Sequence, residues 1–572
     1  ATMSNHGEPI GSWHEYTPEG KAESKDKKEK LKYALEHLEI GPLDSLNADL
    51  LDQVHPVKWK DPDGIPVYNI IAIGAGAGGL VTCGSTSRAG GKAALIEDKM
   101  MGGDCLNVGC VPSKALLSAA KCAYKCRTAS SWGVNVKEVS CDFAKIMERM
   151  REIRAGIAEN DSVQRFTNTL GVDVYIGRAK FLSKNTLQVG DGKILKFRKC
   201  CIATGGRARV PSEYKSVPYC TNATIFNLTE LPKKLAVIGA GPIGCELGQA
   251  FVRFGSQVKI FSRRGIVMSK EDPEAAAIVK QQMEKEGVEF IAATTEKCEV
   301  RDSKILMTYK TKEGKVVEEL FDELLLSAGR VPNIEGLNLE AAGVQYTQRG
   351  VTVNDHLQTS NPDIYATGDV CLKEQFTHMS GTSAVLVTDN ALKGMNRKYS
   401  DFVIPRVTFT EPEVAHVGLT EPEIKNKFGE EYYMFKRPFK IVDRNITDGY
   451  KEGFCKMFTK KKTDEILGCT IVGHGAGEML GIVTTAMVGK LGALTVAKII
   501  CPYPTMHENV KFTAAGFRGK LKNMKPYYER KLKAEREGTT TCANPAMKLS
   551  IIAFCGLALA AATYRFFAKK TK

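Results

Sequence analysis

A chain of 572 residues is too long for a single hydrophobic core, and its length predicts roughly three or four domains. Hydrophobic residues make up 43% of it, charged residues 25%, and 53 positions are glycine, which excludes a disordered or fibrous protein and directs attention to nucleotide-binding loops. Much of the formal net charge of +15 lies near the end of the chain, so we expect a membrane surface there and no nucleic acid as partner.

The 17 cysteines are odd in number and scattered along a large chain, which excludes a secreted disulfide scaffold. A reducing compartment fits better, and any disulfide in it is expected to be catalytic. The chain begins with Ala1. Removal of an initiator or a targeting peptide is one interpretation, and a cloning remnant is the other.

Residues 1–66 are predicted to form an N-terminal extension. A charged run is followed by Leu31, Leu35 and Leu38 at helical spacing, and a second helical pattern contains Leu46, Leu50 and Val54. Two interpretations stay open: the extension packs on the body or a partner, or it is a solvated leader with marginal helices.

The first dinucleotide-binding unit begins at Tyr68. A buried strand leads into a glycine loop and a helix, and a second strand, residues 93–96, ends at Glu97. In this context the glycines allow a tight turn, close approach of a pyrophosphate and close helix packing, and the acid can accept from ribose hydroxyls. The predicted cofactor-binding residues are Gly74, Gly76, Gly79 and Glu97.

Two cysteines follow this unit in the stretch Gly102–Lys114. On a regular helix, Cys105 and Cys110 would be separated by a rise of about 7.5 Å, beyond the ~7 Å Cα limit of a disulfide. A bridge therefore needs a distorted turn, which Asn107 and Gly109 make easy. A thiolate near a helix N-terminus and Lys114 is expected to have a lowered pKa.

A second dinucleotide-binding unit begins at Leu235 and contains the loop glycines Gly239, Gly241 and Gly244. Its second strand ends in Ser262-Arg263-Arg264 instead of an acid. The two arginines favour the 2′-phosphate of NADPH over NADH. The alternative is that both arginines are only solvated.

The C-terminal part changes character twice. From residue 401 strands with turns are followed by helices to about residue 515, and the segment from Arg518 to Arg536 holds eight Lys or Arg residues and two acids. The sixteen residues Leu549–Tyr564 carry no charge. They span about 24 Å as a helix, and snorkelling Lys548 and Arg565 extend that reach. We expect a single transmembrane anchor, with a buried terminal helix as the alternative.

Several motifs together resemble those of the glutathione reductase, dihydrolipoamide dehydrogenase and mercuric reductase superfamily, the class I pyridine nucleotide-disulfide oxidoreductases. The resemblance covers about residues 67–517, and two of its motifs look closest to the mercuric reductase branch: Val407–Glu413 and Tyr503–Met506. The shared motifs are Cys105–Lys114, Ala203–Gly206, Gly329–Asn333 and Ala366–Asp369.

The resemblance implies an α/β fold with two Rossmann-like three-layer domains for FAD and NADPH and an α+β dimerisation domain. The boundaries that it implies are 67–210 and 333–400 for the FAD domain, 211–332 for the NAD(P)H domain and 401–517 for dimerisation. The basic run and the apolar run, and not the resemblance, add a basic linker at 518–546 and a C-terminal transmembrane helix as an anchor at 547–567.

The resemblance also assigns roles to single residues. Cys110 lies nearest the flavin and Cys105 attacks the acceptor, while Lys114 and Glu246 match an ion pair near the flavin. Cofactor contacts fall on Gly103, Thr204, Gly205, Gly329, Arg330 and Asp369. No metal site is expected.

One position departs from the disulfide reductases of the superfamily. Tyr503 occupies the place of their acid–base histidine, while Glu508 keeps the expected spacing. A phenol with a pKa near ~10 is a poor proton shuttle, so reduction of a small disulfide is disfavoured. Mercuric reductases carry a tyrosine here but also use a C-terminal vicinal cysteine pair, and this chain offers only Cys542 before its apolar segment.

Two functions remain at this point. The first is a homodimeric, NADPH-oxidising flavoenzyme tethered to an organelle membrane, chloroplast or mitochondrial, with an unidentified acceptor that includes metal ions and thiol proteins as candidates. The second is a structural, largely redox-silent flavoprotein subunit of a membrane assembly. The intact loops and cysteine pair favour the enzyme.

Overall fold

The computed structural model describes residues 25–190, 192–524, 529 and 533. The chain divides after Val414 into two compact units, which are described separately. The predicted anchor at 547–567 and most of the basic linker lie outside the described residues. Within the part that is described, no helix is both long enough and apolar enough to cross a bilayer.

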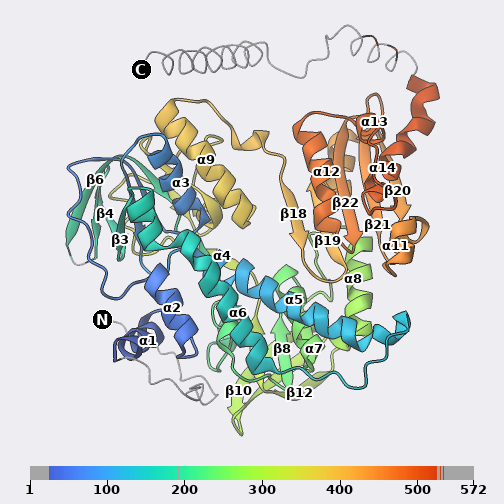
Figure 1. The fold of residues 1–572 in the computed structure, drawn as a ribbon, viewed down its shortest axis with the longest axis horizontal. Helices are drawn as coiled ribbons and strands as arrows, with labels where there is room; N and C mark the ends of the chain where they lie inside the picture. The colour runs from blue at the N-terminus through green and yellow to red at the C-terminus, as the bar shows by residue number, and fades with distance from the viewer. Residues whose placement is uncertain (1–24, 191, 525–528, 530–532, 534–572) are drawn as a thin grey trace, which may run out of the picture. The chain divides into compact units, whose positions relative to one another are not determined.

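The N-terminal extension forms two helices, α1 (Lys25–His37) and α2 (Ser45–Val54), visible beside each other in Figure 1. Leu50, Leu51 and Val54 are fully buried in the same core as the strands of the first sheet. The segment after α2 covers the edge strand β3, where Trp59 Nε1 donates to the carbonyl of Val174. For residues 25–66, the interpretation as an extension that packs on the body is therefore confirmed, and the interpretation as a solvated leader is wrong; residues 1–24 lie outside the described residues.

The first sheet belongs to the predicted FAD domain and has the order β3-β2-β1-β6-β5-β4, with β17 also paired to β6. Because β17 comes from a much later part of the chain, residues after the second nucleotide unit return to complete this sheet. Helices α3 (Ala77–Arg88) and α9 (Thr377–Lys393) lie side by side (Figure 1). The strands are β1 (Tyr68–Ile73), β2 (Ala93–Glu97), β3 (Asp173–Ile176), β4 (Ala179–Ser183), β5 (Thr186–Val189), β6 (Lys193–Ile202) and β17 (Ile364–Ala366).

Three helices connect β2 to β3. They are α4 (Gly103–Val108), α5 (Cys110–Arg127) and α6 (Phe143–Ala158). The first two carry the cysteine pair.

The second sheet has the order β12-β11-β10-β9-β8-β13. Its parallel strands β8 and β13 are apolar and buried at every position but the first, as expected for strands covered on both faces. Their bounds are β8 (Lys234–Ile238), β9 (Gln257–Ser262), β10 (Val288–Arg301), β11 (Lys304–Thr311), β12 (Val316–Phe321) and β13 (Glu323–Leu326), with helices α7 (Pro242–Phe254) and α8 (Pro273–Lys285). Shorter strands of the first unit are β7 (Gly206–Ala208), β14 (Arg330–Pro332), β15 (Tyr346–Thr347), β16 (Gly350–Val351) and β18 (Pro405–Thr408).

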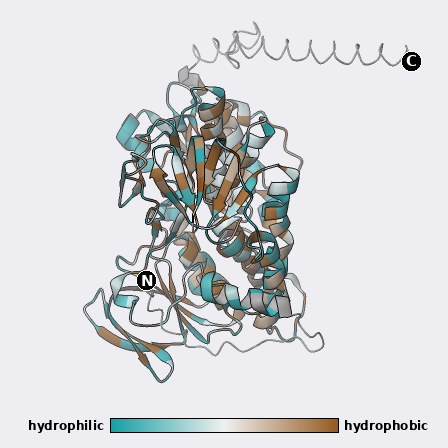
Figure 2. Cartoon of the chain, turned by 90° about the vertical axis from the view of Figure 1, so that its left-hand side faces the viewer, coloured by the Kyte–Doolittle hydropathy of each residue, from teal (hydrophilic) through white to brown (hydrophobic). Residues whose placement is uncertain are grey.

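The second unit is an α+β domain. Strands β20, β21 and β22 are antiparallel neighbours, and β21 and β22 are buried along nearly their whole length. Figure 2 shows hydrophobic residues, in brown, along the strands of the sheets. The elements are β19 (Glu413–Gly418), which begins at the unit boundary, β20 (Tyr432–Pro438), β21 (Phe454–Lys460), β22 (Ile466–Gly473), α10 (Glu421–Phe428), α11 (Asp443–Thr447), α12 (Ala476–Val488), α13 (Ala493–Val496) and α14 (Glu508–Ala515). The predicted α/β fold with two Rossmann-like sheets and an α+β domain is confirmed.

Candidate active site

The first glycine loop fits a pyrophosphate. A Cβ on Gly74, which has a φ of +98°, would lie 2.5 Å from the carbonyl oxygen of Ala203, and a Cβ on Gly79 would lie 1.8 Å from that of Gly74. Gly76 caps α3 without any side-chain hydrogen bond. The amides at the start of α3 are therefore not used by a cap and can bind phosphate.

Gly103 lies against this loop. A Cβ on Gly103 would lie 2.7 Å from the Cα of Gly76. The start of α4, the helix that carries Cys105 and is called the redox helix below, is therefore too close to the glycine loop for a side chain at position 103. This close approach places the predicted cofactor residue Gly103 beside the pyrophosphate loop.

Glu97 closes the loop from the end of β2. Its two carboxylate oxygens accept from the amides of Ala75 (2.6 Å) and Lys99 (2.8 Å). Burial, reinforced by Asp98, raises the pKa of Glu97 to about 8. Glu97, which was predicted to accept hydrogen bonds from the ribose, thus also holds the backbone of the glycine loop in place. The distance in sequence between Glu97 and the glycine loop did not indicate this second role.

Arg330 connects the redox helix to the predicted ribitol contact. It donates from Nε to Asp369 (3.0 Å) and from Nη2 to the carbonyl of Gly206 (2.6 Å), and it also pairs with Asp104 beside Cys105. Gly329 has a φ of +106°. The predicted residues Gly329, Arg330 and Asp369 therefore lie together.

Thr204 and Gly205 form the turn after β6. Thr204 Oγ1 donates to the carbonyl of Asn333 at 2.6 Å, and the Asn333 amide donates back to the carbonyl of Thr204 at 2.9 Å. Gly205 has a φ of +66°, and a Cβ at this position would meet no atom within 4 Å. The left-handed backbone, and not crowding, therefore explains the glycine.

The second glycine loop repeats the first geometry. A Cβ on Gly244 would lie 2.0 Å from the carbonyl of Gly239, whereas one on Gly241 would meet nothing within 4 Å. Gly241 caps α7 without a side-chain hydrogen bond, which again leaves amides for a pyrophosphate. Arg263 and Arg264 follow β9 and are exposed.

The cysteine pair lies at a break between two helices. Gly109, with φ −137° and ψ −109°, separates α4 from α5, and Cys110 is the first residue of α5. The distorted turn that a bridge requires is present, and it lies at Gly109. Asn107 is helical, and its side-chain amide donates to the carbonyls of Met101 and Gly103 at 2.9 Å each.

The two thiols are free in the structure and differ strongly in acidity. A hydrogen bond from Cys105 lowers the pKa of Cys110 to about 6, with further help from Thr377 and Lys114. The same hydrogen bond, together with burial, raises the pKa of Cys105. Thr377 Oγ1 lies 3.3 Å from the Cys110 sulfur. These surroundings favour the thiolate at Cys110 and the protonated thiol at Cys105.

The predicted ion pair between α5 and α7 is present. Lys114 Nζ lies 2.7 Å from Glu246 Oε2, and the other oxygen of this buried carboxylate accepts from the amide of Phe409 at 2.8 Å. The ammonium also lies 4.5 Å from the centre of the Phe409 ring. The segment after β18 therefore fixes both members of the pair.

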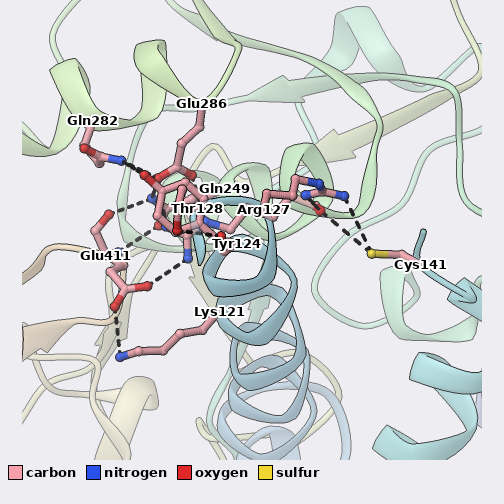
Figure 3. Close-up of polar contacts among 10 residues, drawn as sticks. Lys121, Tyr124, Arg127, Thr128, Cys141, Gln249, Gln282, Glu286 and Glu411 are labelled. Atoms are coloured by element: carbon pink, nitrogen blue, oxygen red, sulfur yellow. Dashed lines mark hydrogen bonds and ion pairs between the residues drawn. The ribbon is translucent and has the colours of Figure 1, made fainter. Parts of the chain in front are cut away.

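A second polar network supports the other end of the same two helices (Figure 3). Arg253 on α7 is buried, pairs with Glu286 (2.7 Å) and Glu411 (3.0 Å), and its guanidinium lies 4.3 Å from the Tyr124 ring. Lys121 on α5 also reaches Glu411, at 3.0 Å. Arg253 and Lys121 thus pair with two carboxylates, and these ion pairs join α5, α7 and the segment after β18.

The predicted acid–base candidates lie in the second unit. Tyr503 is 73% exposed, and its hydroxyl donates to Asp443 at 2.9 Å, which raises the pKa of the phenol. Glu508 accepts from the amide of Thr505 at 3.4 Å. Asp443, not Glu508, is the hydrogen-bonding partner of Tyr503.

Sequence reasoning missed Thr377, Asp443 and Asp104. Asp104 stands directly before Cys105 in the cysteine motif, so its position was a usable signal. Thr377 and Asp443 reach their partners only through tertiary folding, across 267 and 60 residues, and carried no local signal.

Comparisons with known proteins agree with this geometry. Residues 68–388 match the family model of the pyridine nucleotide-disulphide oxidoreductases, and residues 404–514 match the model of their dimerisation domain. The mercuric reductase of Lysinibacillus sphaericus is 33% identical over 455 residues, which are 79% of this chain and 82% of that protein. The dihydrolipoyl dehydrogenase of Geobacillus stearothermophilus is 32% identical over 445 residues, 77% of this chain and 93% of that protein.

A solved structure is also similar. The Cu(II) complex of the HOCl-induced flavoprotein disulfide reductase RclA from Escherichia coli superposes with a TM-score of 0.70 at 26% sequence identity. The match covers 79% of this chain and 99% of that structure.

The role of Thr377 can be tested through the acidity of Cys110. Replacing Thr377 with Val removes a hydroxyl that stabilises the thiolate, so the pKa of Cys110 should rise above its value of about 6. The measurement is the ultraviolet absorbance of the thiolate in the reduced protein, with Cys110→Ser as the blank. As the pH is lowered, this absorbance should be lost at a higher pH in Thr377→Val than in the unaltered protein. Thr377→Ser keeps the hydroxyl and should titrate like the unaltered protein. An unchanged titration of Thr377→Val would contradict the assignment.

Proposed function

Because the chain belongs to the pyridine nucleotide-disulphide oxidoreductases, enzymes that use FAD and NAD(P)H, we propose that it passes electrons from NADPH through FAD to a Cys105–Cys110 disulfide and on to an acceptor. The observation that carries the proposal is the geometry of the cysteine pair. Cys105 and Cys110 lie on either side of the helix break at Gly109, with the Thr377 hydroxyl 3.3 Å from the Cys110 sulfur and the Lys114–Glu246 ion pair one helical turn further along α5.

The chain's own residues are suited to hold both cofactors. The uncapped starts of α3 and α7 would bind the two pyrophosphates, Glu97 the ribose of FAD, and Asp369 with Arg330 its ribitol side. FAD, when bound, would accept two electrons from the nicotinamide and pass them to the disulfide.

The cysteines divide the remaining work. Cys110 is stabilised as a thiolate by Cys105, Thr377 and Lys114, so it is the sulfur suited to face the flavin. Cys105 becomes the nucleophile when its proton passes along the hydrogen bond to the Cys110 sulfur, and the Cys105 thiolate then attacks the acceptor. The Lys114–Glu246 pair keeps the ammonium near Cys110 and anchors α5 to the nicotinamide helix α7.

The class of electron acceptor is proposed from the absence of an acid–base histidine at position 503. Tyr503, with its raised pKa, is a poor proton shuttle at neutral pH, which disfavours reduction of a small disulfide. Metal ions, thiol proteins and small electrophiles remain the proposed acceptor classes, and Hg(II) is among them because of the similarity to mercuric reductases. The dimerisation domain indicates a homodimer, in which Tyr503 and Glu508 would complete the partner subunit's site.

The location of the enzyme is also a proposal. The basic segment and the uncharged run near the C-terminus support tethering to an organelle membrane, chloroplast or mitochondrial, through residues 547–567.

An anaerobic titration with NADPH tests the proposed electron path. We expect bleaching of the flavin followed by a long-wavelength band from charge transfer between the Cys110 thiolate and the flavin. Cys110→Ser should abolish this band and keep FAD, whereas Cys105→Ser should keep the band because the thiolate remains. Neither bleaching nor a band in the unaltered protein would contradict the proposal and favour the structural-subunit alternative.

The choice of nicotinamide is tested at the end of β9. Arg263→Glu places a carboxylate where the 2′-phosphate is proposed to bind, so the Kd for NADPH should rise at least about tenfold, while the Kd for NADH changes little. Arg301→Glu makes the same charge change at an exposed position elsewhere in this sheet and serves as the control. Equal weakening of NADPH and NADH by Arg263→Glu would refute the NADPH preference.

A further inference from the structure

One buried arginine connects the redox helix to the N-terminal extension. Arg154 on α6 is 1% exposed, and burial lowers its pKa to about 10, so it stays charged at neutral pH. Its Nη1 donates to the carbonyl of Asn107 at 2.8 Å, and its Nη2 donates to Oδ1 of Asn47 at 2.6 Å. A buried cation thus lies between α4 and α2.

The acceptor on the extension is held rigidly. Asn47 is 1% exposed, and its amide nitrogen donates to the carbonyl of Pro42 at 2.8 Å, which sets the amide so that its oxygen faces Arg154. Asp44 caps the start of α2 and pairs with Arg151, one helical turn before Arg154, at 2.6 Å. The charge of the arginine pair is partly offset by this buried carboxylate.

Two further contacts join the extension to the segment just before α4. The carbonyl of Val54 at the end of α2 accepts from the amide of Met101 at 3.0 Å, and His55 Nδ1 contacts the carbonyl of Lys99. The amide of Asn107 reaches back to the carbonyl of Met101. The extension therefore contacts both the entrance of α4 and, through Arg154, its end.

The carbonyl that Arg154 binds lies in the last turn of α4. In a continuous helix the carbonyl of Asn107 would accept from the amide of Val111, and the two cysteines would then be separated by a rise of about 7.5 Å. Arg154 takes this carbonyl, and Asn222 takes the next one, that of Val108, at 3.3 Å. Side chains thus satisfy the last carbonyls of α4 and stabilise the break at Gly109.

We propose that the N-terminal extension, acting through Asn47 and Arg154, is a positioning element that stabilises the helix break and so holds Cys105 and Cys110 within bonding distance. The family match begins at residue 68, so Asn47 lies outside the part of the chain that the family model describes. The inference rests on the proposed redox role of the cysteine pair, and it deepens that role by adding Asn47 and Arg154 as positioning residues.

The consequence is a shift in the thiol–disulfide equilibrium. With oxidised dithiothreitol, the two thiols lose two electrons and two protons, the sulfur–sulfur bond between Cys105 and Cys110 forms, and the reagent is released as its dithiol. The equilibrium constant grows with the effective concentration of one thiol near the other. Loosening the break should therefore disfavour the disulfide.

The test measures this constant in dithiothreitol redox buffers, by trapping thiols with an alkylating reagent in FAD-containing protein without NADPH. Asn47→Leu removes the acceptor at similar volume and should lower the constant at least about fivefold, the factor that ~1 kcal/mol gives. Asn47→Asp keeps an oxygen acceptor for Arg154, so its equilibrium constant should stay close to that of the unaltered protein. Arg154→Lys loses the fork that reaches both partners and should behave like Asn47→Leu.

Gln53→Leu is the matched control, because Gln53 lies on the same helix and donates to Ala155 next to Arg154, at 3.0 Å, without reaching α4. Unaltered constants in Asn47→Leu and Arg154→Lys, or an equal drop in Gln53→Leu, would overturn the inference. Since the assay contains no NADPH, failure of the proposed electron path and failure of this inference give different results.

Discussion

The contact between Cys105 and Cys110 is the interaction on which the rest of the site depends. It exists because α4 ends at Val108 and α5 starts at Cys110, with Gly109 in a conformation that neither helix adopts. The hydrogen bond between the thiols then separates their acidities, with the pKa of Cys110 lowered and that of Cys105 raised. A continuous helix would have kept the sulfurs apart and left two ordinary thiols.

Two ion-pair networks fix the positions of the helices that carry the two cysteines. The Lys114–Glu246 pair joins α5 to α7, and so connects the helix that carries Cys110 to the second dinucleotide-binding unit. Arg330 joins Asp104 to Asp369, and so connects α4 to the proposed flavin site. In both cases a buried or partly buried charge is paired within the first unit, which avoids the cost of a desolvated lone charge and makes the position of the helices specific.

Much of this site could be predicted from the sequence because its signals are local. Glycine loops after buried strands, and a cysteine motif containing Gly109, depend on backbone conformations that short stretches of residues dictate. The Lys114–Glu246 pair spans 132 residues, and only the family resemblance made it predictable. The same resemblance gave the positions of Tyr503 and Glu508 but no indication of Asp443, to which the Tyr503 hydroxyl donates.

Other features could not be predicted because they arise from packing between distant segments. Thr377 reaches Cys110 from the start of α9, and the extension proved to be part of the first core rather than a leader. Helical spacing in residues 25–54 indicated two helices correctly but carried no information about what their apolar faces cover. The carbonyl that Arg154 binds is a backbone group, and such contacts leave no trace in residue patterns.

In the proposed electron path, electrons from NADPH arrive at one specific cysteine pair among the 17 cysteines of the chain. Differential alkylation read by peptide mass spectrometry, before and after anaerobic addition of NADPH to the FAD-loaded homodimer, tests this path. We expect that two new thiols per chain become labelled, at Cys105 and Cys110. Reduction of the flavin without new thiols, or new labels at other cysteines such as the buried neighbours Cys455 and Cys469, would contradict the claim.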